Sequence, residues 1–265
     1  STKGQLMPQS PIRKLVPYAE QAVKNGKSIY YLNIGQPDIK TPKIALQAVK
    51  DSDIDVLAYS RSEGSEAYRE KISAYYNKHD IHVIHDDIIV TTGGSEALLF
   101  AFGSIMDVDD EIIIPEPFYA NYIGFSEIAD VNIKPITSTI ESNFALPSAA
   151  DFEKIITPRT KAIMICNPNN PTGTWVKSAE LKAFMDKVPE DVLVILDEAY
   201  YEYVDDKDYP PTVPWSKQYP NVSVTRTFSK AYGLAGARAG YAIANEEITG
   251  LINRPRQPVN MNSLA

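Results

Sequence analysis

Short apolar runs alternate with helical patterns from residue 88 onward. The runs are rich in β-branched residues, and in the stretches between them apolar residues recur at three- to four-residue spacing. The predicted strands are 88–92, 111–114, 132–136, 161–166, 192–196, 222–227 and 239–244, and the predicted helices are 95–106, 118–129, 149–156 and 178–188. This alternation predicts an α/β fold, a three-layer sandwich with a mostly parallel seven-stranded sheet covered by helices on both faces.

Two regions depart from the regular alternation. Too little chain separates the runs 222–227 and 239–244 for a crossover helix, so one of these two strands is predicted to be antiparallel. The first fifty residues are rich in proline and predict an extended arm with short helices over 12–25 and 42–51.

Composition and charge exclude several classes of protein. The net charge of −8 and the pI near 5.0 argue against nucleic-acid binding, which needs a basic surface. Cys166 is the single cysteine, so no intrachain disulfide is possible, and the three histidines lack the spacing of a zinc site. The N-terminus has no apolar signal-peptide core, and no apolar run approaches the ~20 residues needed to cross a membrane. We therefore expect a cytoplasmic protein.

Unusual polar residues follow several predicted strands, at the edge where open α/β sheets bind ligands. Gly93 and Gly94 lead into a helix whose free amides can hold a phosphate, although such a pair is more often a tight turn. Asp197 ends a buried strand and needs a cationic partner, unless it serves as a helix N-cap. Lys230 follows another strand and is a candidate nucleophile, although a lone loop lysine is usually just solvated.

Further segments fit a ligand site at the same edge. Near Lys230, Thr227, Ser229 and Arg238 supply hydroxyls and a guanidinium suited to an anion. Residues 167–173 form a rigid proline- and asparagine-rich turn, and residues 34–38 form a glycine turn that a carboxylate can approach. Taken singly, both segments also fit ordinary loops.

Together and in this order, the motifs resemble those of the pyridoxal-phosphate (PLP) dependent aminotransferases of fold type I, the aspartate aminotransferase superfamily. The resemblance covers nearly the whole chain. The matching motifs are GQPD at 35–38, Tyr59 with Gly64, GGSEA at 93–97, PEPFY at 115–119, NPNNPTG at 167–173, DEAY at 197–200, and SK at 229–230 followed by Arg238.

The resemblance implies roles for the residues around the cofactor ring. Lys230 would form a Schiff base with PLP and shuttle a proton, and Asp197 would keep the pyridine nitrogen protonated. Tyr200 and Asn170 would bind the phenolic oxygen of PLP, while Tyr119 would stack on the ring. The implied catalytic residues are therefore Lys230, Asp197 and Tyr200.

The resemblance also implies ligands for the phosphate, the substrate and a partner subunit. The phosphate would bind the amides of Gly94, Ser95 and Glu96 together with Thr227, Ser229 and Arg238. Tyr59 would reach the phosphate of a neighbouring subunit, which implies a homodimer with shared active sites. Gly35 and Asn170 would contact the substrate.

The resemblance divides the chain into an N-terminal arm with a small-domain portion over residues 1–52 and a large PLP-binding domain over residues 53–265. The superfamily places a substrate-binding arginine in a C-terminal domain, yet only Arg254 and Arg256 follow Arg238 before the sequence ends. We therefore expect that the C-terminal part of the small domain is absent and that these 265 residues alone are not a competent transaminase.

The implied activity moves an amino group from an L-amino acid to a 2-oxo acid. Residues 35–38 and 115–122 favour an aspartate-like donor. Residues 197–203, 228–236 and 254–264 favour the alternative, a histidinol-phosphate or aromatic aminotransferase. A PLP-dependent C–S lyase would share the cofactor residues, and a PLP-binding sensor domain of a regulator is the non-enzyme alternative. No helix-turn-helix or basic segment precedes Gly35, which argues against the sensor.

Overall fold

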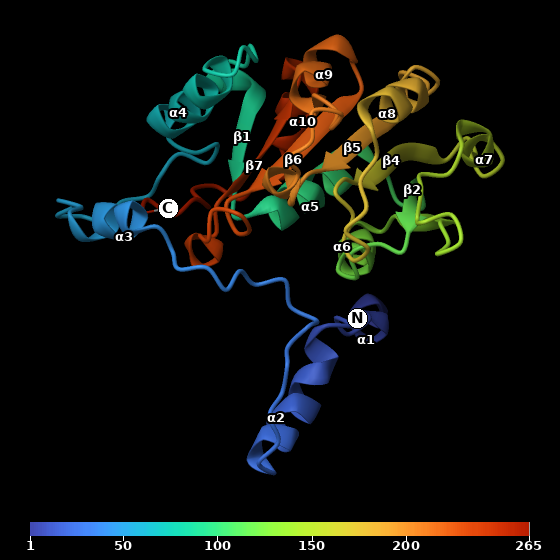
Figure 1. The fold of residues 1–265 in the computed structure, drawn as a ribbon. Coiled ribbons are helices and arrows are strands. Elements are labelled where there is room, and N and C mark those ends of the chain that lie inside the picture. Colours follow the sequence, from blue (N-terminus) through green and yellow to red (C-terminus); the bar gives the residue numbers. More distant parts are fainter. Residues whose placement is uncertain (265) are drawn as a thin grey trace.

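The computed structural model describes residues 1–264 and contains one seven-stranded sheet (Figure 1). The strands are β1 (Ile88–Thr91), β2 (Glu111–Glu116), β3 (Asn132–Thr137), β4 (Thr160–Cys166), β5 (Leu193–Asp197), β6 (Val222–Thr227) and β7 (Gly240–Ala244). Their order in the sheet is β1-β7-β6-β5-β4-β2-β3. Strands β2 to β6 pair in parallel, and β7 runs antiparallel to both of its neighbours. The predicted sheet, including its antiparallel member, is confirmed.

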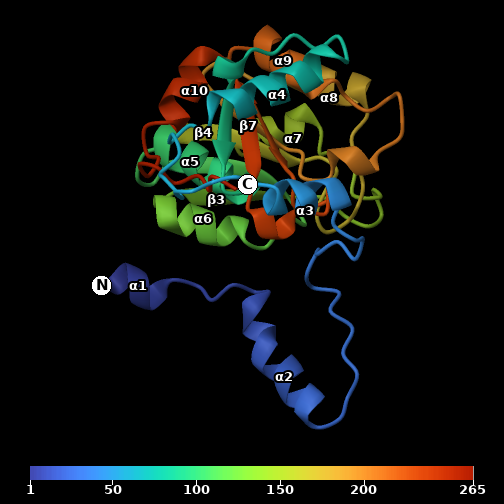
Figure 2. The ribbon, with the colours of Figure 1, turned by 90° about the vertical axis from the view of Figure 1, so that its left-hand side faces the viewer.

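Helices cover both faces of the sheet, so the fold has three layers (Figure 2). The faces carry α4 (Glu66–Asn77), α5 (Gly94–Ile105), α6 (Tyr122–Ala129), α7 (Ala149–Glu153), α8 (Ser178–Met185), α9 (Thr212–Gln218) and α10 (Glu246–Ile252). Helices α4, α7, α8 and α9 share one apolar core with the sheet, and α5, α6 and α10 share the other. Successive strand residues alternate between these cores, because neighbouring side chains point to opposite faces.

Some helices differ from the sequence prediction. Helix α6 begins at Tyr122 rather than at residue 118, and α7 and α8 end a few residues before the predicted limits. Helices α4, α9 and α10 were not predicted. In α4 the Ser65 hydroxyl accepts from the Tyr68 amide, and Ile72 and Tyr76, four residues apart, face the core. A serine N-cap and apolar residues four positions apart are typical of a helix, but the charged residues of α4 between them weakened the apolar pattern in the sequence.

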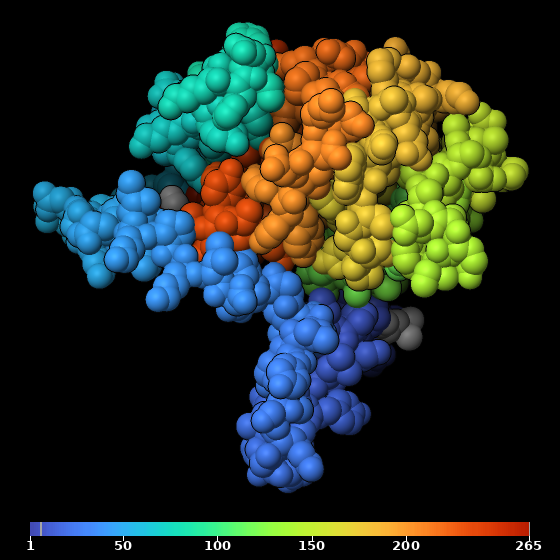
Figure 3. All heavy atoms as spheres, viewed as in Figure 1, coloured from blue at the N-terminus to red at the C-terminus, as the bar shows by residue number. Residues whose placement is uncertain are grey.

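The N-terminal segment lies outside the sheet body (Figures 1 and 3). It contains α1 (Thr2–Leu6), η1 (Arg13–Leu15), α2 (Val16–Lys24) and α3 (Lys43–Lys50), and the predicted helices 12–25 and 42–51 correspond to η1 with α2 and to α3. Neither α2 nor α3 has a buried residue. Contacts with the body include Lys3 with Asp130 and the Thr41 hydroxyl with the Gly233 carbonyl. None of the helices in residues 1–264 is long and apolar enough to span a membrane.

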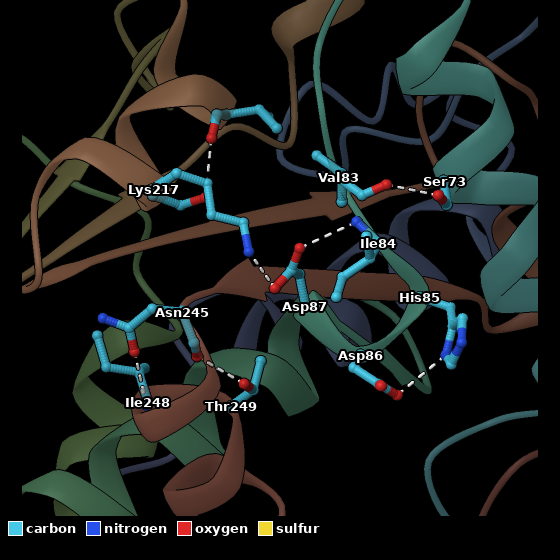
Figure 4. Close-up of polar contacts among 12 residues, drawn as sticks. Ser73, Val83, Ile84, His85, Asp86, Asp87, Lys217, Asn245, Ile248 and Thr249 are labelled. Atoms are coloured by element: carbon cyan, nitrogen blue, oxygen red, sulfur yellow. Dashed lines mark hydrogen bonds and ion pairs between the residues drawn. The ribbon is translucent and has the colours of Figure 1, made fainter.

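Polar contacts fix the sheet edge at the start of β1 and the end of β7 (Figure 4). The 3-10 turn η2 (His85–Asp87) places the buried Asp87 carboxylate where it accepts from Lys217 of α9 and from the Ile84 amide. Asn245 caps α10 by accepting from the Ile248 amide at 2.9 Å. These bonds stabilise the edge opposite the strand ends that carry the candidate chemistry.

One close contact joins β7 to the loop after β1 and generates a stability prediction. A Cβ on Gly240 would lie 2.7 Å from the backbone of Gly93 and Gly94 and 2.9 Å from the Arg226 carbonyl. Gly240→Ala therefore forces backbone segments apart and is expected to lower the free energy of unfolding by about 2 kcal/mol, as for overpacked cores. Urea unfolding measures this change.

Gly250→Ala is the matched control. Gly250 lies in α10, and a Cβ there would meet no atom within 4 Å. Alanine at this helical position should raise the free energy of unfolding by about 0.5–1 kcal/mol. Equal stability of Gly240→Ala and the wild type would contradict the close packing of β7 on residues 93 and 94.

Candidate active site

The ends of several strands converge at one edge of the sheet. Because β7 is antiparallel to both neighbours, its first residue, Gly240, pairs with Thr91 at the end of β1 and with Thr227 at the end of β6. On the other side of β6, Asp197 ends β5 and pairs with Thr225. This topology brings the loops after β1, β5 and β6 together, as predicted for a ligand site in an α/β sheet.

The Lys230 amine contacts the N-terminal segment. Its Nζ donates to the Gly35 carbonyl at 2.7 Å. A Cβ on Gly35 would lie 3.0 Å from Tyr200 Oη and 3.1 Å from Lys230 Nζ, so glycine allows this close approach. Burial lowers the pKa of Lys230, and Arg238 lowers it further against the opposing effect of Asp197. At a given pH a larger fraction of this amine is therefore neutral than of a solvated lysine, and the neutral amine is the form that acts as a nucleophile or accepts a proton.

Asp197 is a buried carboxylate held by two neutral donors. Its Oδ2 accepts from Tyr122 Oη at 2.6 Å, and its Oδ1 accepts from the Ala199 amide at 3.2 Å. Within residues 1–264 it forms no salt bridge. Burial raises the pKa of Asp197, and the hydrogen bond from Tyr122 opposes that rise. A cation placed beside this carboxylate would stabilise its charged form.

Tyr122 is the functional residue that our sequence analysis did not assign to the site. It is fully buried at the start of α6, and its ring packs edge-on against Tyr119 with 5.4 Å between centroids. Burial raises the pKa of Tyr122 well above its usual range, so the phenol stays protonated and remains a donor to Asp197. Its position three residues after Tyr119 was an available signal, because the turn closed by the Tyr122 amide and the Tyr119 carbonyl at 3.0 Å brings the two residues together.

Tyr200 and Asn170 lie together, as the sequence analysis expected. Asn170 Nδ2 donates to Tyr200 Oη at 3.1 Å, which joins the loop after β4 to the loop after β5. Burial raises the pKa of Tyr200 to about 12. The phenol and the amide thus offer hydrogen bonds at the same point beside Lys230, whose Nζ lies 5.3 Å from the centre of the Tyr200 ring.

Hydroxyls and a guanidinium converge at the start of α5. Thr227 Oγ1 bonds Ser229 Oγ at 2.9 Å, and Arg238 Nη1 donates to the same Ser229 oxygen at 3.4 Å. Arg238 Nη2 donates to the Thr92 carbonyl at 3.1 Å. A Cβ on Gly93 would lie 2.7 Å from this Nη2, and Gly93 has a φ of +89°, so the approach requires glycine. Cationic and hydroxyl donors at a helix N-terminus form an anion site.

Two predicted phosphate ligands have other environments. The Glu96 amide donates to the Gly93 carbonyl at 3.2 Å, and the Glu96 carboxylate accepts from the Thr92 amide, so Glu96 stabilises the turn. Tyr59 is 87% exposed and forms no side-chain hydrogen bond with residues 1–264, so this single chain does not bring it to the site. Gly94 and Ser95, in contrast, begin α5 directly after Gly93, which lies against the Arg238 guanidinium.

Comparisons with known proteins identify the family. The family model for aminotransferase class I and II matches residues 27–265. This chain belongs to the class I and II aminotransferase family. Histidinol-phosphate aminotransferase 1 of Idiomarina loihiensis is 40% identical over 73% of the chain and 53% of its own length. Histidinol-phosphate aminotransferase 2 of Carboxydothermus hydrogenoformans is 38% identical over 85% of the chain and 59% of its own length.

Solved structures support the same family. The Thermus thermophilus aspartate aminotransferase with maleate superposes with a TM-score of 0.88 at 25% identity, covering 100% of this chain and 71% of that one. The Thermotoga maritima aspartate aminotransferase gives a TM-score of 0.89 at 25% identity, covering 100% and 72%. This aminotransferase chain spans between half and three-fifths of the length of the two curated relatives above.

Members of the family use pyridoxal phosphate, and the donor set of this chain fits that group. The buried Asp197 carboxylate, which forms no salt bridge within residues 1–264, matches a protonated ring nitrogen. The Lys230 amine has a lowered pKa suited to an aldehyde, and Arg238 with the hydroxyls of Thr227 and Ser229 suits a phosphate.

The bond from Tyr122 to Asp197 predicts a pH-dependent loss of stability. Tyr122→Phe removes a donor from a buried carboxylate and should cost about 1–3 kcal/mol of unfolding free energy while Asp197 is charged. The loss should shrink as the pH falls, because protonation of Asp197 in the folded state removes the charge that needed the donor. Urea unfolding at about pH 8 and about pH 5 measures both values.

Tyr203→Phe is the control for this prediction, because Tyr203 is largely exposed and its hydroxyl forms no hydrogen bond with residues 1–264. It should leave the stability unchanged at both pH values. A Tyr122→Phe loss of equal size at both would show that Asp197 is not the group that the phenol stabilises.

Proposed function

We propose that this chain forms the cofactor-binding core of an aminotransferase that moves an amino group from an amino donor to a 2-oxo acid. The observation that carries the proposal is the convergence of the Lys230 amine, the buried Asp197 carboxylate and the Arg238 anion site at one sheet edge. We assign residues 1–52 to the arm and small-domain portion and residues 53–265 to the large domain.

Each residue around the cofactor ring has a separate proposed role. Bound PLP supplies an electron sink for the carbanion formed at the substrate α-carbon. Lys230 Nζ attaches the cofactor and moves a proton at that carbon, and Asp197 holds the proton on the ring nitrogen. Tyr200 and Asn170 orient the phenolic oxygen, and Tyr119 covers the ring. These assignments follow from the motifs and from the geometry around Lys230.

The phosphate and substrate ligands complete the proposed site. Arg238, Thr227, Ser229 and the amides at the start of α5 hold the phosphate, while Glu96 supports the turn that presents those amides. Gly35 and Asn170 border the space beside the Lys230 amine, where a substrate would lie.

We propose histidinol phosphate as the amino donor and 2-oxoglutarate as the acceptor. Curated relatives with 36–58% identity bear the name histidinol-phosphate aminotransferase, which favours the donor class that our sequence analysis placed second. The aspartate-like donor has support from structural neighbours at 24–25% identity, so aspartate is the second candidate.

We also propose that the protein is a homodimer with shared sites. The N-terminal segment leaves large apolar side chains exposed, with Leu32 at 95% and Tyr30 at 86%. A second copy packed on this segment would cover that surface and carry Tyr59 toward the neighbouring phosphate site.

Covalent attachment at Lys230 is the first test. The chain incubated with PLP and then reduced with borohydride should carry the cofactor on Lys230, as located by peptide mass spectrometry. Lys230→Ala should retain some cofactor non-covalently. In a protein that also carries the C-terminal part of the small domain, it should lose at least about a hundredfold in amino-transfer rate, the usual range for a lost acid–base group.

Lys154→Ala is the matched control, because Lys154 is an exposed lysine at the C-terminal end of α7 that pairs with Asp151. It should bind and attach the cofactor as the wild type does. Label on a lysine other than Lys230, or none at all, would overturn the proposed function.

Donor preference is the second test. The cofactor-loaded protein is mixed with L-histidinol phosphate, L-aspartate, L-phenylalanine or L-cysteine, and conversion of the bound cofactor to its amine form is followed by absorption. Histidinol phosphate should react fastest. Faster reaction with aspartate would favour the second candidate, and release of pyruvate and ammonia from cysteine without amino transfer would replace both with a C–S lyase.

A further inference from the structure

A second polar cluster lies behind the candidate site, on the opposite face of the sheet. Asp197 and Glu198 are consecutive, and their side chains point to opposite faces, so Asp197 meets Tyr122 of α6 while Glu198 meets Arg226 of β6. Arg226 in turn lies between Thr225 and Thr227 and faces away from the anion site. The two clusters therefore share the backbone of β5 and β6.

The cluster is a fully enclosed ion pair. Arg226 donates from Nε at 2.9 Å and from Nη2 at 2.6 Å to one oxygen of Glu198. The other oxygen of Glu198 accepts from the hydroxyls of Thr212 and Tyr209. Glu198 is 0% exposed and Arg226 is 3% exposed, so neither reaches a substrate.

An aromatic ring completes the cluster and links it to the site. The Arg226 guanidinium lies 3.4 Å from the centre of the Tyr201 ring. The preceding residue, Tyr200, has its hydroxyl on the other side, where it accepts from Asn170. Each residue of the cluster thus neighbours a residue of the proposed site, Glu198 beside Asp197 and Tyr201 beside Tyr200.

The ion pair lies where the backbone hydrogen bonds between β5 and β6 stop. The last paired residues are Asp197 and Thr225, and the Glu198 amide donates to the Thr225 carbonyl at 3.0 Å. Beyond this point the segments that follow the two strands separate, β5 leading into η3 (Tyr201–Tyr203) and β6 into the Ser229–Lys230 loop. The Glu198–Arg226 ion pair connects the segments after β5 and at the end of β6, past the last backbone pairing of these two strands.

A buried ion pair is a poor device for stability alone, because desolvating two charges offsets most of their attraction. We infer that Glu198, Arg226 and Tyr201 form a positioning cluster that sets Asp197 and Tyr200 relative to Lys230. The consequence for the cofactor rests on the proposed function, whereas the effect on the loops is a property of the chain itself.

The test compares Glu198→Gln with Glu111→Gln in the full chain. Glu111 is also a buried carboxylate, 1% exposed, that accepts from Thr157 at 2.7 Å and pairs with the solvent-accessible Arg159 and Lys134, but it lies at the start of β2, the opposite sheet edge. Both substitutions replace a buried carboxylate by an amide and are expected to lower stability. Only Glu198→Gln should alter the candidate site.

The first readout needs no cofactor. Amide hydrogen exchange of peptides covering residues 197–203 and 226–230 should be at least about tenfold faster in Glu198→Gln than in the wild type, and unchanged in Glu111→Gln at matched stability. The second readout is the dissociation constant of PLP, which should rise about 10- to 100-fold in Glu198→Gln alone, the range seen when outer partners of bound groups are removed.

A second variant keeps the test valid if Glu198→Gln does not fold. Glu198→Met with Arg226→Met replaces both charges by apolar side chains of similar length, which buried pairs often tolerate, and it should fold yet show the same faster exchange. Matching exchange in Glu198→Gln and Glu111→Gln, or wild-type exchange in the double variant, would overturn the positioning role. Failure of the wild type to bind PLP would refute the proposed function, and the exchange measurement would still decide the inference.

Discussion

The candidate site depends on the packing of one antiparallel strand, β7, between β1 and β6. Its first residue, Gly240, touches the backbone of Gly93 and Gly94 and pairs with Thr227. That contact holds the start of α5 beside Thr227 and allows Arg238, two residues earlier, to reach the Thr92 carbonyl. Without it, the helix amides, the hydroxyls and the guanidinium would belong to separate loops, and no anion site would form.

Sequence patterns predicted the parts of the molecule whose signals are local. Strand and helix alternation predicted the layers, and the strand ends pointed to Asp197, Lys230 and Arg238. The family resemblance added Tyr200 and Asn170, which lie beside Lys230 in the structure. Long-range partners were not predictable from pattern. The Tyr122 hydroxyl reaches Asp197 across 75 positions, and the role of Glu96 in the turn depends on its side chain folding back on Thr92. These depend on tertiary packing, which a one-dimensional pattern does not contain.

The carboxylates of Asp197 and Glu198 lie on opposite faces of the sheet, because side chains alternate along a strand. At Asp197 the chain buries a carboxylate with neutral donors, which leaves it able to interact with a cation, whereas at the next residue it buries a carboxylate that Arg226 already neutralises. Two adjacent carboxylates thus have different partners: Asp197 has neutral hydrogen-bond donors, and Glu198 has a cation. In the DEAY motif the first carboxylate forms no salt bridge within residues 1–264, whereas the second is paired with Arg226, a distinction that composition does not reveal.

The hydrogen bond from Lys230 to the Gly35 carbonyl joins residues 195 positions apart. Closing so long a loop costs conformational entropy that a single hydrogen bond does not offset, so this contact follows the formation of the sheet during folding. Lys230 is therefore covered late in folding. An intermediate with a complete sheet but without the docked segment around Gly35 would leave the Lys230 amine open to solvent. Any aldehyde in solution could then react with this amine before the rest of the site has formed.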